Sequence, residues 1–252
     1  MKSARAMCVK IIAMLFAVLV TQAQELNPVL PDGWHVHDIN RPEPKKVIPG
    51  KINTQAPSDA IILFDGKDFN QWQGDNASPV EWNLLDDYME VVPKTGNIQT
   101  KQAFGDIQLH LEFLIPESAI KDGQTRVIGG VFLMGIYKLQ IIYSKEKSYS
   151  DGLEGAIFGQ IPPLVNASKE IGNWQSYDIV FKTPVFQNET LISPAYITVF
   201  QNGVLIQNHA EIIGPAAYKT IKPYTSHAKK LPLMLQDHWS PVRYRNIWVR
   251  EL

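Results

Sequence analysis

The feature that most limits how this chain can fold is a strict alternation of apolar and polar residues over positions 107–115. In a β-strand, successive side chains point to opposite faces of the sheet, so a period of two residues separates an apolar face from a polar one. The apolar face would carry Ile107, Leu109, Leu111, Phe113 and Ile115, and the polar face Gln108, His110 and Glu112. The segment is therefore predicted to be a strand with one buried face.

Similar short runs recur from residue 60 to the end of the chain, and no long segment has the period of a helix. They read AIILF, EWNLL, YMEVV, GGVFLM, YKLQIIY, QSYDIVF, AYITVFQ, VLIQN, LPLML and YRNIWV. Asn202-Gly203 separates two of these runs and is typical of a tight hairpin turn. About a dozen strands without a long helix favour an all-β fold, a two-sheet jelly-roll β-sandwich.

The first 23 residues have the pattern of a cleavable signal peptide. Three basic residues and no acidic residue occur in positions 1–10, an apolar run follows from Ile11 to Val20, and small residues occupy the expected cleavage region. The only cysteine, Cys8, lies in this segment, so the mature chain would have no disulfide. We expect a periplasmic or secreted protein with no membrane span after cleavage.

Residues 24–57 contain six prolines and little periodicity, which predicts an extended arm before a domain at 58–252. His35 and His37 lie in this arm, but two histidines on an extended segment do not make a zinc site. No cofactor is predicted, although the residue pattern leaves a divalent metal ion open. The oligomeric state stays open as well.

Charge argues against nucleic acid as a partner. Without residues 1–23 the chain has 21 basic and 25 acidic residues, and no Lys/Arg block appears. The carboxylates also argue against an ordinary retaining glucanase, which needs two of them about 5 Å apart. Glu112 alternates with His110 rather than with a second acid, and Glu81 and Glu90 fall on different segments.

Several motifs in order along the domain resemble the 3-keto-disaccharide hydrolase family. They are AIILFDGKDFNQW, YKLQI, GAIFGQIPPLVNAS, NGVLIQNH and LQDHWSPVRYRNIWVREL. The resemblance spans about residues 58–252 and implies a sandwich of the concanavalin A-like lectin and glucanase type. It also implies cleavage or elimination of glycosides that carry a ketone at C3, by removal of the C2 proton, so a glycoside hydrolase or lyase is expected.

Strand parity and the resemblance together suggest the site residues. His238 is expected to be the proton-transfer group, since histidine titrates near neutral pH, and Asp237 either orients it or caps a turn. The expected substrate-binding residues are Lys138, Gln140, Gln236, Arg245 and Trp72. Each has a structural alternative: Gln140 as a core amide, Arg245 as an ion-pair partner, Trp72 as a core residue and His238 as a turn residue.

The sequence departs from the family pattern around this site. Lys138 stands where the family usually has Glu, Tyr143 where it has Asp, and Trp239 where it has Gly. Val127-Ile128-Gly129 replaces the usual Asn-Ser-Gly. A charged lysine cannot accept hydrogen bonds, so Lys138 is predicted to favour acidic or electron-rich sugars. A carbohydrate-binding protein without catalysis, on the same fold, is therefore a second hypothesis.

Overall fold

The computed structural model describes residues 28–121, 125–146 and 149–252. The predicted signal peptide, with Cys8, lies outside the described residues. The chain divides into two compact units, residues 1–46 and 47–252. In the first unit, Val29 and His35 form an isolated bridge and Arg41 pairs with Asp32. All the strands of the described residues lie in the second unit.

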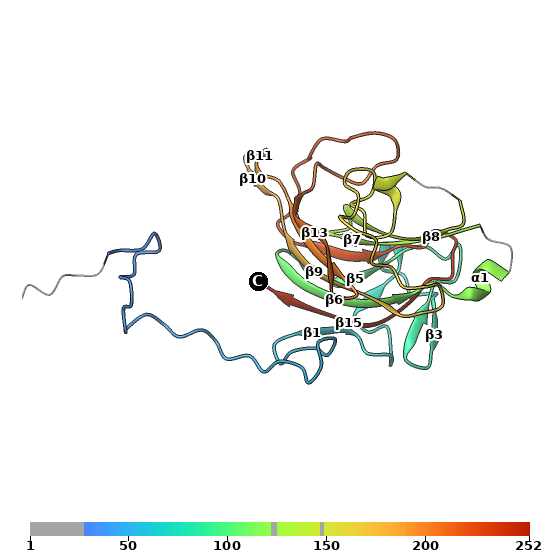
Figure 1. Ribbon diagram of the computed structural model, residues 1–252, viewed down its shortest axis with the longest axis horizontal. Coiled ribbons are helices and arrows are strands. Elements are labelled where there is room, and N and C mark those ends of the chain that lie inside the picture. The colour runs from blue at the N-terminus through green and yellow to red at the C-terminus, as the bar shows by residue number, and fades with distance from the viewer. Residues whose placement is uncertain (1–27, 122–124, 147–148) are drawn as a thin grey trace, which may run out of the picture. The chain divides into compact units, whose positions relative to one another are not determined.

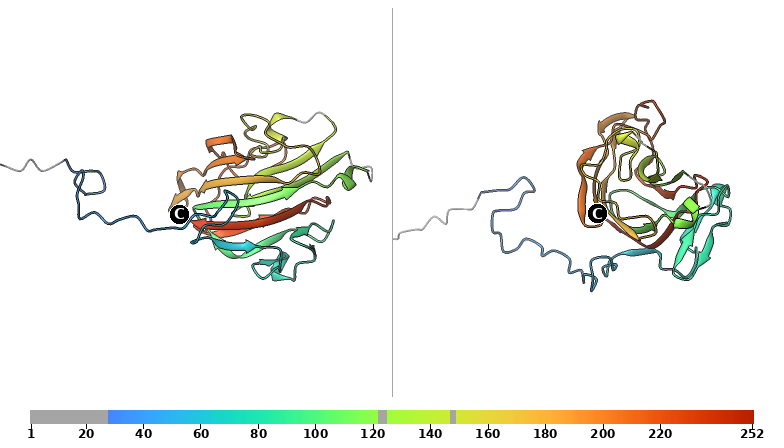
Figure 2. Two further views of the ribbon diagram at one scale, coloured as in Figure 1. Left: turned by 60° about the horizontal axis from the view of Figure 1, so that its bottom comes forward. Right: turned by 45° about the vertical axis from the view of Figure 1, so that its right-hand side comes forward.

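The second unit is a sandwich of two antiparallel sheets, which confirms the predicted all-β fold (Figure 1). The long strands of the larger sheet run side by side in the left view of Figure 2. Their order is β13-β12-β9-β6-β15-β4-β3, with β1 also paired to β15. These strands are β1 (Ile61–Phe64), β3 (Asn83–Leu85), β4 (Tyr88–Glu90), β6 (Ile107–Leu114), β9 (Gln175–Lys182), β12 (Tyr196–Gln201), β13 (Val204–Glu211) and β15 (Arg243–Glu251).

The smaller sheet has the order β2-β5-β14-β7-β8. Its strands are β2 (Trp72–Gln73), β5 (Ile98–Phe104), β7 (Arg126–Leu133), β8 (Tyr137–Ser144) and β14 (Leu231–Leu235). A separate hairpin joins β10 (Val185–Gln187) to β11 (Thr190–Ser193). The helices are short: η1 (Asp75–Ala77), α1 (Glu117–Lys121) and η2 (Ser150–Gly152). The described helices are all too short to cross a membrane.

The core lies between the two sheets and contains the apolar face predicted for residues 107–115. Phe113 of β6 packs on Tyr177 of β9, with ring centroids 4.7 Å apart. The Tyr177 hydroxyl crosses to the smaller sheet and donates to the Gln140 carbonyl oxygen at 2.8 Å. The predicted hairpin is confirmed as well: Asn202 and Gly203 join β12 to β13 with positive φ angles of 52° and 82°.

The segment after η2 closes the outer edge of β8. Bridges link Leu139 to Ile157 and Ile157 to Ile161. The amide of Phe158 donates to the Lys138 carbonyl oxygen, and that of Gly155 to the Gln140 carbonyl oxygen, both at 3.0 Å. Residues 152–161 therefore follow β8 and form a wall beside its outward-facing side chains.

Candidate functional site

A cavity of about 300 Å³ opens on the face of β8 that points away from the core. Lys138, Gln140 and Ile142 line it from this strand, whereas Tyr137, Leu139 and Ile141 belong to the core. The alternation of β8 thus gives the faces that the sequence predicts. His238, just after β14, lines the same cavity. The structure therefore brings three of the predicted site residues together, and their roles in binding and catalysis stay predictions.

Lys138 is the most unusual group in this cavity. Lys138 is 5% exposed, and its Nζ lies 4.6 Å from the ring centroid of Phe158 and 5.8 Å from that of Phe132. No described carboxylate lies within 4.0 Å of this nitrogen. Burial therefore lowers the pKa of Lys138 to about 7. With this pKa the amine of Lys138 exists in both its charged and its neutral form near pH 7, and the preference for acidic or electron-rich sugars stays a prediction.

Gly130 of β7 makes room for the lysine side chain. A methyl group at this position would lie 2.4 Å from Cε of Lys138 and 3.3 Å from Oε1 of Gln236. Gln236 is hydrogen-bonded to β7 through its backbone, since its amide donates to the Gly130 carbonyl oxygen at 3.0 Å. Lys138 and Gln236 thus approach the same stretch of β7.

Two glutamine carbonyls beside the lysine are buried without a described partner. Gln140 donates from Nε2 to the Gly152 carbonyl oxygen at 3.2 Å, but its Oε1 accepts no hydrogen bond from the described residues. The Oε1 of Gln236 is in the same state. A buried acceptor without a donor costs free energy. Gln140 lines the cavity, so its oxygen is suited to a hydroxyl group of a ligand, whereas Gln236 is not among the lining residues. Gln140 is then neither a fully satisfied core amide nor an open surface residue.

His238 is exposed, and its ring lies 5.6 Å from that of Trp239. No described side chain forms a hydrogen bond with its imidazole nitrogens. Asp237 instead accepts from the amides of Gly96 at 3.1 Å and Trp239 at 2.7 Å. Of its two expected roles, the geometry supports the turn cap, and Asp237 does not orient His238.

Trp239 has a left-handed backbone with a φ of 61°. Such a conformation favours glycine, which is the residue expected from the family at this position. The substitution keeps the turn and adds a large indole, 66% exposed, next to His238.

Loop residues that the sequence analysis did not identify form the mouth of the cavity. Tyr149 and Tyr218 lie on two different loops, and their hydroxyl oxygens are 3.3 Å apart. Hydrogen bonds with Tyr149 and Lys219 lower the pKa of Tyr218. Arg126, at the start of β7, lines the cavity as well. Both tyrosines lie outside the strands, so the alternation of residues along a strand cannot predict where their side chains point. Only the three-dimensional structure identifies the pair.

A second cavity of about 460 Å³ shares part of this lining. Tyr149, Gly152, Phe158 and Tyr218 border both cavities. The second is completed by residues 217–221 of a long loop and by Asp151 and Gly159. Two compartments therefore meet at the tyrosine pair, and both lie within or near the usual range of small-ligand sites, about 300–1,000 Å³.

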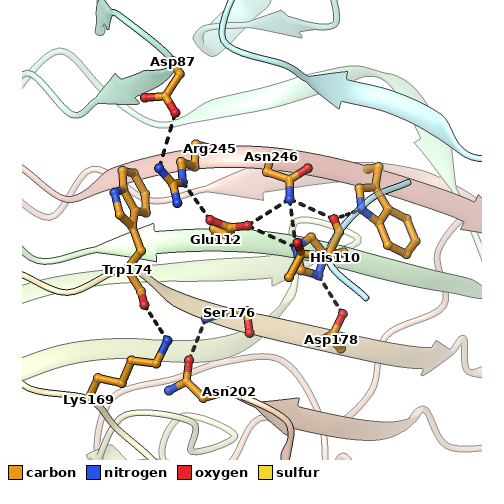
Figure 3. A network of polar contacts seen from close by, with 12 residues as sticks. Asp87, His110, Glu112, Lys169, Trp174, Ser176, Asp178, Asn202, Arg245 and Asn246 are labelled. Atoms are coloured by element: carbon orange, nitrogen blue, oxygen red, sulfur yellow. Dashed lines mark hydrogen bonds and ion pairs between the residues drawn. The ribbon is translucent and has the colours of Figure 1, made fainter. Parts of the chain in front are cut away.

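Arg245 does not belong to this cavity, contrary to the prediction. It lies on the outer face of the larger sheet, where Nε donates to Glu112 at 2.7 Å and the guanidinium stacks 4.1 Å from the ring centroid of Trp174 (Figure 3). The register of β15 shifts between Arg245 and Trp248, with Asn246 in the left-handed region. The alternative of an ion-pair partner is the one that the structure supports.

The same outer face contains His110, which is fully buried there. Its Nδ1 lies 2.6 Å from Asp178, and its ring stacks on Trp248 with centroids 5.3 Å apart. Residues 47–57 cover this group, since Thr54 accepts hydrogen bonds from Asn246 and Trp248. Although burial alone would lower the pKa of His110, its bonds to Asp178 and Glu112 raise it. This arrangement is a buried polar network that ties residues 47–57 to the sheet.

Trp72 does not lie at the site either, contrary to the prediction. It is 3% exposed, belongs to the core cluster and donates from Nε1 to the Leu63 carbonyl oxygen at 2.8 Å. Its indole is therefore a core group and cannot be a sugar platform. In the described part of the chain, no three His, Cys, Asp or Glu side chains form a cluster suited to a metal ion.

Comparisons with known proteins agree with this architecture. A crystal structure from Parabacteroides distasonis ATCC 8503, described provisionally as a glycosyl hydrolase, is 36% identical with a TM-score of 0.78. The alignment covers 89% of this chain and all of the other. A further structure from the same organism and with the same description is 20% identical, with a TM-score of 0.55, over 77% of this chain and 99% of the other, and shows the fold alone.

No functionally curated protein matches the sequence. The family model of the 3-keto-alpha-glucoside-1,2-lyase-like domain matches residues 59–250, which is most of the chain and contains every residue of the cavity. The chain therefore belongs to the 3-keto-alpha-glucoside-1,2-lyase-like family of carbohydrate-active proteins.

Proposed function

We propose that the protein is a lyase acting on glycosides whose sugar carries a ketone at C3. The observation that carries this proposal is the lining of the inner cavity. Among the described residues it contains a histidine, a buried lysine, an arginine and two tyrosines, but no carboxylate. Double-displacement glycosidases need two carboxylates, whereas elimination next to a ketone needs a base, a carbonyl partner and a proton donor.

His238 is the proposed base. A C3 ketone acidifies the proton at C2, and a neutral imidazole is the side chain best suited to remove it near pH 7. The imidazole nitrogens of His238 are not held by other described side chains, so they are available to the sugar. Lys138 is the proposed partner of the C3 oxygen, because it lines the same cavity and offers N–H donors.

The tyrosine pair at the mouth is the proposed proton donor to the leaving group. Tyr149 and Tyr218 border both compartments, so a glycoside with its keto sugar in the inner cavity would place its C1 oxygen near them. The aglycone would then occupy the outer compartment. Removal of the C2 proton forms the enolate, the C1–oxygen bond breaks, and the departing oxygen receives a proton.

The test is turnover of a nitrophenyl 3-keto-glucoside, prepared with hydrogen or deuterium at C2. Release of nitrophenol with a primary isotope effect supports elimination. Release without an isotope effect, and without deuterium entry at C2 from D₂O, would instead indicate direct hydrolysis and contradict the proposal. Binding without release would favour a carbohydrate-binding protein.

A matched pair of histidine variants tests the base. His238→Ala should lose about 10²–10⁴-fold in kcat, which is the usual contribution of a general acid or base. His209→Asn is the control, since His209 is exposed on β13, outside the cavity, and Asn tolerates its positive φ of 45°. Full activity in His238→Ala, with an unchanged melting temperature, would contradict the role of His238 as the base and favour the turn residue of the structural alternative.

A further inference from the structure

The position of Lys138 allows chemistry beyond hydrogen bonding. Its amine lies near the rings of Phe132 and Phe158, and the described lining of the cavity has no carboxylate to hold it as a permanent cation. The proposed substrate presents a ketone to that cavity. A neutral lysine amine in an apolar pocket is the group that proteins use to form imines with carbonyl substrates.

We propose that Lys138 forms a covalent imine with the C3 carbonyl of the keto sugar, and that the resulting iminium drives loss of the C2 proton to His238. This inference rests on the proposed function and adds a covalent intermediate to it. An iminium withdraws electrons from C2 more strongly than a ketone does, and it needs no separate donor for an enolate oxygen.

The steps balance without any added oxidant or reductant. The Lys138 nitrogen attacks C3, the C3 oxygen leaves as water, and a protonated C=N bond forms with one proton taken from the solvent, which the final hydrolysis returns. His238 takes the C2 proton, and the electron pair forms a C2=C3 bond in an enamine. The enamine then re-forms the iminium and pushes electrons into a C1=C2 bond, so that the C1–oxygen bond breaks. The aglycone oxygen takes a proton from a mouth tyrosine, and water hydrolyses the iminium to free the amine.

Two opposing influences act on the amine. Aromatic rings at 4.6 and 5.8 Å favour the ammonium ion. Burial favours the neutral amine and is the larger influence, because it holds the pKa of Lys138 at about 7. Near neutral pH both forms are present, so the same nitrogen can attack as an amine and exist as an iminium.

The first experiment is reductive trapping. The protein is incubated with the 3-keto-glucoside and cyanoborohydride, which reduces iminium ions in preference to ketones, and is then digested for mass spectrometry. One sugar-derived group on Lys138 is the expected result, with activity lost only when both reagents are present. The recovered substrate should also exchange its C3 oxygen with ¹⁸O-water, since imine formation releases that oxygen.

The second experiment compares lysine variants. Lys138→Met keeps the length of the side chain and Lys138→Arg keeps a positive charge, but neither can form an imine. Both should lose at least about 100-fold in kcat, the lower end for a catalytic group. Lys138→Ala should recover part of its activity when a small alkylamine is added. Lys182→Met, at an exposed position of β9, is the control and should keep wild-type turnover.

The results separate this inference from the proposed function. Turnover with a C2 isotope effect, but with undiminished activity in Lys138→Met or with neither trapping nor ¹⁸O exchange, overturns the imine and leaves the lyase. Absence of turnover in the wild-type protein overturns the lyase itself. Trapping at Lys138 together with inactive Met and Arg variants supports both.

Discussion

The strongest stability prediction concerns Glu154, a buried carboxyl in the wall of residues 152–161. Its Oε1 accepts from Ser168 at 2.6 Å and from Nε2 of Gln201 at 2.5 Å. Burial raises its pKa from 4.5 to about 7, although hydrogen bonds with Ser168 and Gln201 oppose the rise. The folded protein thus holds a proton on Glu154 that the unfolded chain releases near its ordinary pKa.

The sign and size of the effect follow from proton linkage. Because the folded-state pKa is raised, the stabilisation is fully present below about pH 4.5 and is lost as pH rises towards about 7. One pKa unit corresponds to 1.36 kcal/mol, so the free energy of unfolding should fall by about 3 kcal/mol across this window. Glu154→Gln removes the titration and keeps the shape of the neutral acid. The free energy of unfolding of the variant should equal that of the wild type at low pH and exceed it by about 3 kcal/mol above pH 7.

The assay is urea unfolding, followed by tryptophan fluorescence at several pH values between about 5 and 8. The difference between wild type and Glu154→Gln isolates this group from other titrating residues, such as His110. Glu170→Gln is the control, because Glu170 is an exposed glutamate on the neighbouring segment. A difference between wild type and Glu154→Gln that stays constant with pH would refute the reasoning, since Glu154 would then titrate normally in the folded state.

Three further substitutions test the site and its surroundings. Gly130→Ala should push the Lys138 side chain aside and lower kcat by about 100-fold, with little loss of stability, as shown by activity and melting temperature. Trp239→Gly should raise the free energy of unfolding by about 1 kcal/mol through relief of its positive φ, and should weaken sugar binding measured by calorimetry. Arg245→Met should leave turnover unchanged but destabilise the fold by about 1–3 kcal/mol, because Glu112 loses its charged partner.

Strand parity accounts for the parts of the site that the sequence could predict. The alternation in β8 places Lys138 and Gln140 on one face of that strand. His238 follows the end of β14 at Leu235, so strand alternation does not account for its place in the cavity. Parity alone does not say which sheet a strand joins or which face is outward. Arg245 was misplaced for that reason, and the bulge at Asn246 shifts the register further.

Three further features that the sequence did not predict have different physical causes. Trp72 is an aromatic residue next to polar neighbours, and its burial depends on the opposite sheet, which local sequence does not describe. Strand β5 was not singled out because its run, IQTKQAF, contains several polar residues, one of which, Thr100, is buried and bonds within the sheet. Tyr149 and Tyr218 meet only because two long loops fold over β8.

The wall of residues 152–161 has a second consequence, for solubility. Strand β8 is the last strand of its sheet, and most of its residues are buried. An uncovered apolar edge strand is a template on which another chain can add its own strand and aggregate. Here Ile157 already pairs with Leu139. Pro162 and Pro163, which follow the wall, have no backbone N–H to donate to a strand of another chain. Variants that loosen this segment should therefore precipitate as well as lose activity, because one stretch of chain both shapes the cavity and blocks self-association.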